Sequence, residues 1–301
     1  MSIAFIADPD TKAPGIYNPQ PGLIRVVAGN AGPFTYTGTG TYILNTSERC
    51  VVIDPGPQSE SHVKTIIEAI GNRSVDAILV THTHRDHSPA SRALKDHFSA
   101  PILGCAPVIS QTQEAGTAMD ESQDMAYNPD RQLKNGERLQ VGGYNIEVFA
   151  TPGHLANHLC YRWIEHNALF SGDHIMGWAT SVVIPPDGHM ASYMESLERT
   201  LELDLDTIWP THGQPITVPQ PFIKALIAHR KARESAILQQ IRSGNGSIMD
   251  IVATLYHDVP KALHPAAAQS VFAHIIHLIE QGLAKPRSAL SINDFFDISS
   301  A

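Results

Sequence analysis

Residues 81–87 constrain the structure and chemistry of this chain more than any other stretch. They follow an apolar run at 77–80 and precede Ser-Pro-Ala at 88–90. This order is typical of a buried strand that ends in a functional loop and then opens a helix. Imidazole and carboxylate together favour zinc, iron or manganese over calcium or magnesium. The loop offers four such ligands within six positions: His82, His84, Asp86 and His87.

The density of these side chains also suggests more than one metal ion. A single tetrahedral ion could hardly use the neighbours Asp86 and His87 together with both His82 and His84. We therefore expect further ligands elsewhere in the chain.

Composition limits the class of protein. The chain has 301 residues, of which 43% are hydrophobic and 17% charged, as is ordinary for a globular enzyme. No uninterrupted apolar run approaches the roughly 18 residues that span a bilayer, and the first residues lack a basic segment, so neither a membrane anchor nor a secretory signal is expected. Three distant cysteines, Cys50, Cys105 and Cys160, favour buried thiols in a reducing cytoplasm.

The pattern of short β-rich runs and amphipathic stretches predicts an α/β fold made of two αβ halves whose sheets face each other. Residues 112–131 are expected to form a surface excursion over the site. The expected strands are 23–27, 41–44, 50–53, 75–80, 144–150, 158–163, 168–171 and 207–209. The expected helices are 59–70, 88–98 and 191–203, followed after several prolines by a long helix at 222–242.

Further potential ligands follow strands of the second half. His154, Asp173 and His212 each lie beside a glycine just past a short β run. A lone histidine in such a place is more often a hydrogen-bonded structural residue. Three such positions downstream of the 81–87 loop make coincidence a poor explanation.

These motifs resemble the metallo-β-lactamase fold superfamily over residues 20–219, including Ile53-Asp54-Pro55-Gly56. The resemblance implies a four-layer αββα sandwich with a two-metal centre between its sheets. It also implies that Asp173 bridges the two ions and that Asp54 orients the site. The implied ligands of the first ion are His82, His84 and His154, and those of the second are Asp86, His87 and His212.

The same resemblance implies a hydrolase in which a hydroxide bridging two zinc ions is the nucleophile, with iron or manganese as alternatives. Asp173 and Asp86 would be its catalytic carboxylates, and Asp86 would help orient the hydroxide. True metallo-β-lactamases generally lack a bridging carboxylate, so a small thioester, ester or lactone is the expected substrate. Cleavage of single-stranded RNA and promiscuous β-lactam hydrolysis remain the alternatives.

Other polar residues near these motifs have two interpretations each. His158 and His174 would either hydrogen-bond a ligand or be satisfied polar residues of the core. Arg85 would either bind an anionic substrate group or form a salt bridge. Residues 175–180 would wall the pocket or simply pack.

The C-terminal part differs in charge and pattern. Residues 1–221 have 13 Lys or Arg and 24 Asp or Glu, whereas residues 222–288 have eight and four. We expect a catalytic domain at 1–219, a winged-helix-like domain at 220–288 and a tail at 289–301. This C-terminal part resembles the module of the β-lactamase-like protein 2 and glyoxalase-II-like branch through the segments 229–234 and 263–267.

The third expected helix of this module, 265–281, has no Lys or Arg. A helix without cations is poorly suited to a nucleic-acid groove, so contact with nucleic acid is the less favoured expectation. We expect the module to pack against the catalytic domain, to shape one wall of the site or to support a homodimer.

Overall fold

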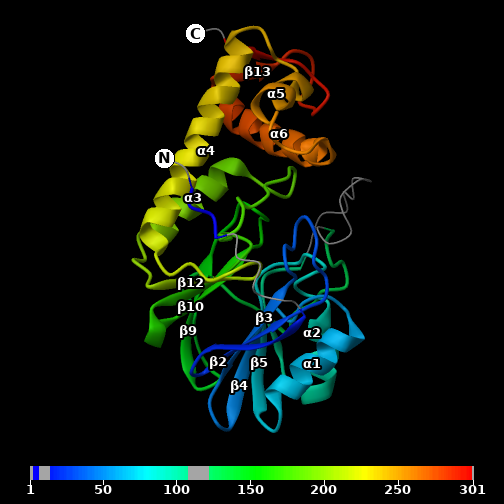
Figure 1. The fold of residues 1–301 in the computed structure, drawn as a ribbon, viewed down its shortest axis with the longest axis vertical. Helices are drawn as coiled ribbons and strands as arrows, with labels where there is room; N and C mark the ends of the chain where they lie inside the picture. The colour runs from blue at the N-terminus through cyan, green and yellow to red at the C-terminus, as the bar shows by residue number, and fades with distance from the viewer. Residues whose placement is uncertain (1–2, 7–13, 108–121, 300–301) are drawn as a thin grey trace.

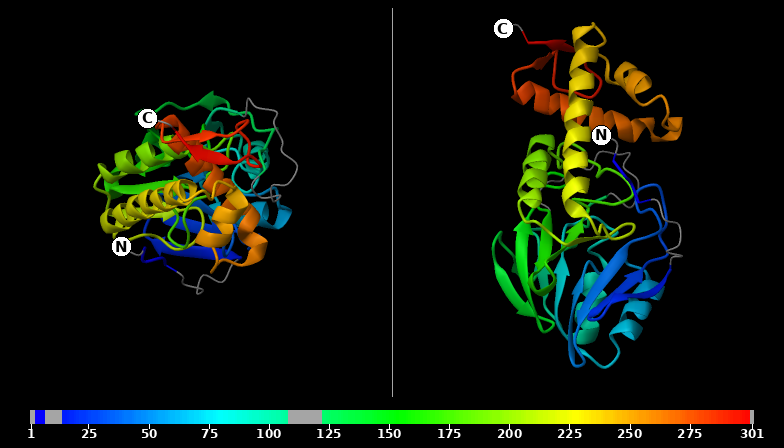
Figure 2. Two further views of the ribbon diagram at one scale, coloured as in Figure 1. Left: turned by 90° about the horizontal axis from the view of Figure 1, so that it is seen from above. Right: turned by 60° about the vertical axis from the view of Figure 1, so that its left-hand side comes forward.

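The computed structural model describes residues 3–6, 14–107 and 122–299. Figure 1 shows an α/β domain with a smaller, mainly helical module at one end. The long helix α4 (Pro219–Arg242) connects the two, and Figure 2 shows it running from the sheets into the module. The first half of the expected surface excursion at 112–131, residues 112–121, lies outside the described residues.

The first half of the chain forms a seven-stranded sheet whose strands follow sequence order. Its first four strands pair antiparallel and the remaining ones pair parallel. The strands are β1 (Gly15–Gln20), β2 (Leu23–Val27), β3 (Gly40–Asn45), β4 (Arg49–Ile53), β5 (Ser74–Val80), β6 (Ile102–Gly104) and β7 (Arg131–Gln132).

The second half forms a five-stranded sheet in the order β12-β11-β10-β9-β8. Only β11 and β12 pair in parallel. The strands are β8 (Arg138–Val141), β9 (Tyr144–Ala150), β10 (Leu159–Trp163), β11 (Ala168–Gly172) and β12 (Thr207–Pro210), with a 3-10 turn, η2 (Ile164–His166), after β10.

Side-chain alternation along the second sheet builds two cores. Tyr161, Trp163 and Phe170 belong to the cluster shared with the first sheet, whereas Cys160 and Leu169 pack on the opposite face. That outer face is covered by α3 (Met190–Leu201) and the start of α4, and the first sheet is covered by α1 (Glu60–Ile70) and α2 (Ala90–Phe98). The predicted αββα sandwich is therefore confirmed.

Helix α4 begins at Pro219, three residues before the expected start. A proline in the first turn costs no hydrogen bond and presets the helical φ, so Pro219 and Pro221 belong to the helix, whereas Pro215 precedes it. Phe222, Ile223 and Leu226 of this helix pack on the catalytic domain, whereas Ile237 and Ile241 pack in the module. The helix therefore belongs to both cores.

The module contains α5 (Ile248–Leu255), η3 (Lys261–Leu263), α6 (His264–Glu280), β13 (Ala284–Pro286) and β14 (Phe296–Ile298). The expected wing at 284–287 is the first strand of a hairpin, and its second strand comes from the segment expected to be a tail. By length and composition, residues 261–280 would suffice to cross a membrane. Seven residues of α6 are nevertheless buried, which is the position of a core helix.

Candidate metal centre

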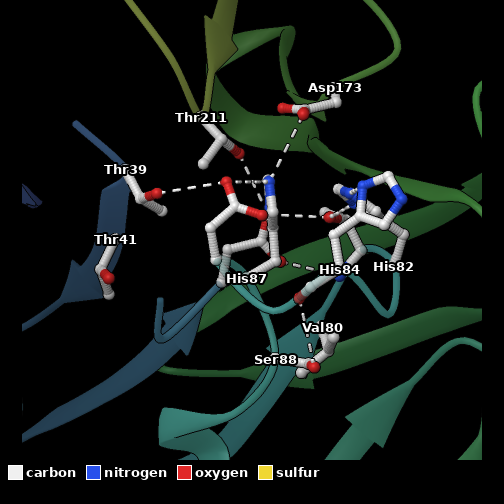
Figure 3. A network of polar contacts seen from close by, with 12 residues as sticks. Thr39, Thr41, Val80, His82, His84, His87, Ser88, Asp173 and Thr211 are labelled. Atoms are coloured by element: carbon white, nitrogen blue, oxygen red, sulfur yellow. Dashed lines mark hydrogen bonds and ion pairs between the residues drawn. The ribbon is translucent and has the colours of Figure 1, made fainter. Parts of the chain in front are cut away.

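Strand ends place seven buried side chains beside one another. The loop 81–87 follows β5, His154 follows β9, Asp173 directly follows β11, and His212 comes two residues after β12. In Figure 3, His82, His84, His87 and Asp173 point toward a common centre. The structure thus brings together all seven predicted metal ligands: His82, His84, Asp86, His87, His154, Asp173 and His212.

The first predicted triad consists of three imidazoles. His84 Nδ1 lies 3.1 Å from His82 Nε2 and 3.2 Å from His154 Nε2. Ligand nitrogens of a tetrahedral zinc site lie about 3.3 Å apart, given Zn–N bonds of about 2.0–2.1 Å. The spacing of these nitrogens therefore fits one ion.

The second predicted triad contains a carboxylate. Asp86 Oδ2 lies 3.1 Å from His212 Nε2 and 3.3 Å from His87 Nε2. It also accepts a hydrogen bond from Thr39 Oγ1 at 3.4 Å, from the loop before β3. The neighbours Asp86 and His87 face the same point because the loop turns after His84, whose carbonyl accepts from His87 N at 3.0 Å.

Asp173 lies between the two triads. Its Oδ2 is 3.5 Å from His87 Nε2 and 3.9 Å from His154 Nε2, and its Oδ1 is 3.4 Å from His212 Nε2. One carboxylate therefore approaches ligands of both triads, as the predicted bridging role requires.

Asp54 holds residues around the centre in place through hydrogen bonds. Its carboxylate accepts from Thr81 N and Thr81 Oγ1, both at 2.8 Å, and from Thr211 Oγ1 at 3.0 Å. It also lies 3.0 Å from His87 Nδ1, which leaves His87 Nε2 free to face the centre. A carboxylate that orients a ligating histidine in this way is common in metal sites.

Other ligands are held by similar contacts on their second ring nitrogen. His154 Nδ1 donates to Val182 O at 2.6 Å, and His212 Nδ1 donates to Gly38 O at 3.4 Å. In each case Nε2 is the ring nitrogen that faces the centre, and it can bind a metal once it carries no proton.

Electrostatics differ between the triads. Burial and the neighbouring imidazoles hold the pKa of His82 well below its ordinary value, and they lower the pKa of His84 to about 3. Burial opposes the charged form of His212 as well, yet Asp173 and Asp86 raise its pKa to about 9. The first triad is neutral, whereas in the second the neighbouring carboxylates favour the protonated forms of His87 and His212, and a metal ion would replace those protons.

Two buried polar atoms support a fit with metal. Among the described residues, neither His87 Nε2 nor Asp173 Oδ1 has a hydrogen-bond partner. An unpaired buried polar atom is costly, and a metal ion at the centre would satisfy both atoms. The donor set therefore fits two divalent ions.

The structure gives different roles to His158 and His174. His158 Nε2 accepts from the backbone N–H of Asp173 at 3.2 Å, so His158 holds the residue that lies between the triads. His174 instead contacts Thr200 Oγ1 on α3 at 3.0 Å and belongs to the polar core. Arg85 is exposed and, among the described residues, forms no ion pair with an acid.

Glycines beside the ligands are required by close packing. Gly172 has a φ of +51°, and a Cβ there would lie 2.7 Å from His158 Nε2. Gly153, at φ +145°, would place a Cβ 2.3 Å from Tyr193 Cα on α3. A side chain at either position would displace the adjacent ligand, Asp173 or His154.

A cavity of about 350 Å³ extends from the centre to the module. Five predicted ligands line one end, which we call the ligand end: His84, Asp86, His154, Asp173 and His212. Residues of α4 and of the module line the other, which we call the module end: His229, Arg230, Arg233, Tyr256, Val259, Leu263, Ala266, Ala267 and Ser270.

The walls between the two ends were only partly predicted. Met176, Trp178 and Thr180 line the cavity, so the expected wall at 175–180 is confirmed. The loop of Pro33, Phe34 and Thr35 was missed, although the neighbouring glycines at 29, 32 and 38 mark an irregular segment. Its neighbour Tyr36 stacks on Trp178 with ring centroids 4.9 Å apart.

Comparison with known proteins agrees with this geometry. Residues 36–212 match the metallo-beta-lactamase superfamily, and residues 247–289 match the beta-lactamase associated winged helix domain. The chain belongs to the metallo-β-lactamase superfamily. As in other members of that superfamily, metal-dependent hydrolysis is the activity of this fold, and the predicted enzyme class is confirmed.

Individual relatives cover nearly the whole chain. A beta-lactamase-like protein 2 homolog of Drosophila melanogaster is 32% identical over 86% of this chain and 88% of its own length. The lactamase-like protein aptB of Emericella nidulans is 29% identical over 82% and 79%. A beta-lactamase domain protein from Burkholderia ambifaria has the same fold, with a TM-score of 0.78 at 18% identity over 97% of this chain and 96% of its own. The predicted branch with a winged-helix module is confirmed.

Proposed function

We propose that this protein is a binuclear metal-dependent hydrolase of small thioesters, esters or lactones. The observation that carries the proposal is the position of Asp173, which approaches His154 of one triad and His87 and His212 of the other. Two bound ions would supply a hydroxide at neutral pH and a Lewis acid for the substrate carbonyl.

The chain's own residues would position the reactants. The negative charges of Asp86 and Asp173 would balance part of the positive charge of the ions. Asp86, which accepts a hydrogen bond from Thr39, would also orient the attacking group. In hydrolysis, the oxygen of water joins the carbonyl carbon and the bond to sulfur or oxygen breaks. The products are a carboxylic acid and a thiol or alcohol, the leaving atom having taken up a proton.

The cavity supports a small acyl substrate. Its volume of about 350 Å³ lies in the range of small-molecule sites, and most of the surface that lines it is apolar. A single RNA strand would need an open cationic groove, whereas α6 contains no Lys or Arg. These features favour a small acyl substrate over RNA.

A substrate panel tests the proposal. One preparation, loaded separately with zinc, iron and manganese, is assayed against thioesters, lactones, β-lactams and a labelled single-stranded RNA, and its metal content is measured. We expect close to two ions per chain and fastest turnover of a thioester, ester or lactone. Cleavage of RNA alone, weakening steeply as salt rises, would instead establish the nuclease alternative. A stoichiometry of one ion in fully active protein would contradict the binuclear centre.

A further inference from the structure

The module end of the cavity contains two arginines that lack an anionic partner. Arg230 is only 4% exposed, and its Nη2 donates to Ser181 O. Arg233 Nη1 donates to Leu255 O at 2.8 Å, and its guanidinium lies 4.2 Å from the ring centroid of Tyr256. Within the described part of the chain, neither guanidinium forms an ion pair with a carboxylate.

Nearby acids are engaged elsewhere. Glu198 lies 2.9 Å from Lys231 Nζ, and Glu234 Oε2 lies 3.2 Å from His274 Nδ1 and 2.7 Å from His277 Nδ1. Burial and the two arginines together lower the pKa of His229, which lines the same cavity, to about 4. Neither of these two carboxylates forms an ion pair with Arg230 or Arg233.

A buried cation of this kind is energetically unfavourable. Arginine stays protonated in proteins, and a buried charge without a counter-charge costs several kcal/mol. Arg230 Nε is also buried without a hydrogen-bond partner. An anionic group of a ligand would pair with the guanidinium and could use its planar donor geometry.

The same segment of backbone joins the two ends of the cavity. Ser181 O accepts from Arg230, and the next carbonyl, Val182 O, accepts from the predicted ligand His154. Met176, Trp178 and other apolar groups line the space between. A small molecule can therefore reach the ligand end and the arginines at once.

We propose that Arg230 and Arg233 form an anion-binding subsite, and that the substrate has a carboxylate or phosphate joined through a short apolar segment to its scissile carbonyl. The subsite itself is inferred from the arginines, whereas its use in hydrolysis rests on the proposed function. The anion could belong to the acyl group or to the leaving thiol.

Equilibrium binding tests the subsite without turnover. Calorimetry with metal-loaded protein would compare hexanoate and hexyl phosphate with the neutral analogue hexanamide. We expect Arg233→Gln to weaken binding of at least one anionic probe by about 10-fold or more and to leave hexanamide binding unchanged. Arg233→Lys should restore part of the affinity, because lysine keeps the charge but not the bidentate geometry.

Matched variants make this result decisive. Lys231→Gln removes a cation two residues away that faces Glu198 and does not line the cavity. It should leave every affinity unchanged. Arg230→Gln should weaken the anionic probes as Arg233→Gln does, and the half-buried Arg233 keeps the test available if the buried Arg230 variant fails to fold. Equal losses in the Lys231 and Arg233 variants, or equal affinity of wild type for hexanamide and both anions, would overturn the subsite.

Hydrolysis assays then identify which part of the substrate carries the anionic group. One pair compares adipoyl and hexanoyl thioesters of the same neutral thiol, and a second pair compares hexanoyl thioesters of a thiol with and without a phosphate. Preference for the anionic member, lost in Arg233→Gln, assigns the anion to the acyl or the thiol side. If all four thioesters are hydrolysed and the anionic member is preferred in neither pair, the subsite is not used in hydrolysis. Arginine-dependent binding without hydrolysis of any thioester would contradict the proposed function while supporting the subsite.

Discussion

The ligand end of the cavity is polar, and several of its histidines are held in place by hydrogen bonds to neighbouring groups. The module end combines apolar side chains with two arginines that form no ion pair with a carboxylate of the described residues. At the ligand end, Asp54, Val182 and Gly38 fix the rings of His87, His154 and His212. At the module end, Arg230 and Arg233 each donate to a backbone carbonyl and lie over a tyrosine ring. The ligand end therefore suits a fixed chemical step, and the module end suits selection of the substrate.

If the ends have these separate roles, removing Asp173 should have the largest effect of any change. Asp173→Asn keeps the shape of the side chain but removes the charge that approaches both triads. We expect metal content and turnover to fall together, turnover by more than about 100-fold, because even outer-sphere partners cost up to about that much. Elemental analysis and kcat/KM measure both quantities. Full turnover with two bound ions would exclude a bridging role.

Asp54 offers a smaller change at the same end. Asp54 is 1% exposed and accepts four hydrogen bonds from Thr81, Thr211 and His87. Asp54→Asn should lower metal affinity by about 10- to 100-fold, as loss of an orienting carboxylate does. Competition with a chelator measures the affinity, and circular dichroism checks the fold. An unchanged affinity would show that Thr81 and Thr211 suffice to position the ligands.

The pH dependence of the metal-free protein sharpens the contrast between the triads. Asp173 and Asp86 outweigh burial and raise the pKa of His212 to about 9, whereas an unfolded histidine has a pKa of about 6.5. The resulting stabilisation is complete below about pH 6.5 and is lost as pH rises through about 9. Metal affinity should rise over the same window, because binding displaces that proton.

Denaturant titrations and chelator competition between pH 6 and 9.5 test both trends. The His82 and His84 rings are neutral in the folded state, and in the unfolded state they lose their protons near pH 6.5, so they should contribute little above about pH 7.5. The His212→Gln variant is the control, since it should reduce the pH dependence of both quantities and leave the part that comes from His87, whose pKa the same carboxylates raise. Metal affinity that is independent of pH in the wild type would contradict a protonated His212 in the metal-free protein.

The two ends also differ in how well the sequence predicts them. The ligand end could be predicted because its residues lie in one dense loop or directly after strands, where edge geometry places them together. The roles of His158 and His174 could not be told apart from the sequence, because both lie close to a predicted ligand. Their contacts in the fold distinguish them: His158 accepts from the backbone N–H of Asp173, whereas His174 contacts Thr200 on α3.

The module end carries no comparable signature. Its apolar residues are ordinary core residues in sequence, and their place in the cavity depends on how α6 packs against α4. The basic run at 230–233 appeared as a single cluster, but the helix directs Arg230 and Arg233 into the cavity and Lys231 toward Glu198. Short edge strands such as β7 and β14 were missed because two or three residues give no period to detect.

The smallest expected effect lies at the wall of the module end. Ala266 on α6 is half-buried and lines the cavity, so Ala266→Phe should fill part of its volume without touching a ligand. We expect kcat/KM for a hexanoyl thioester to fall by about 10-fold, mainly through KM, because lost apolar contact weakens binding in the ground state and transition state alike. Metal content should stay at the wild-type value. A fall in kcat alone, or a loss of metal, would show that the module also shapes the ligand end and that the two roles are not separable.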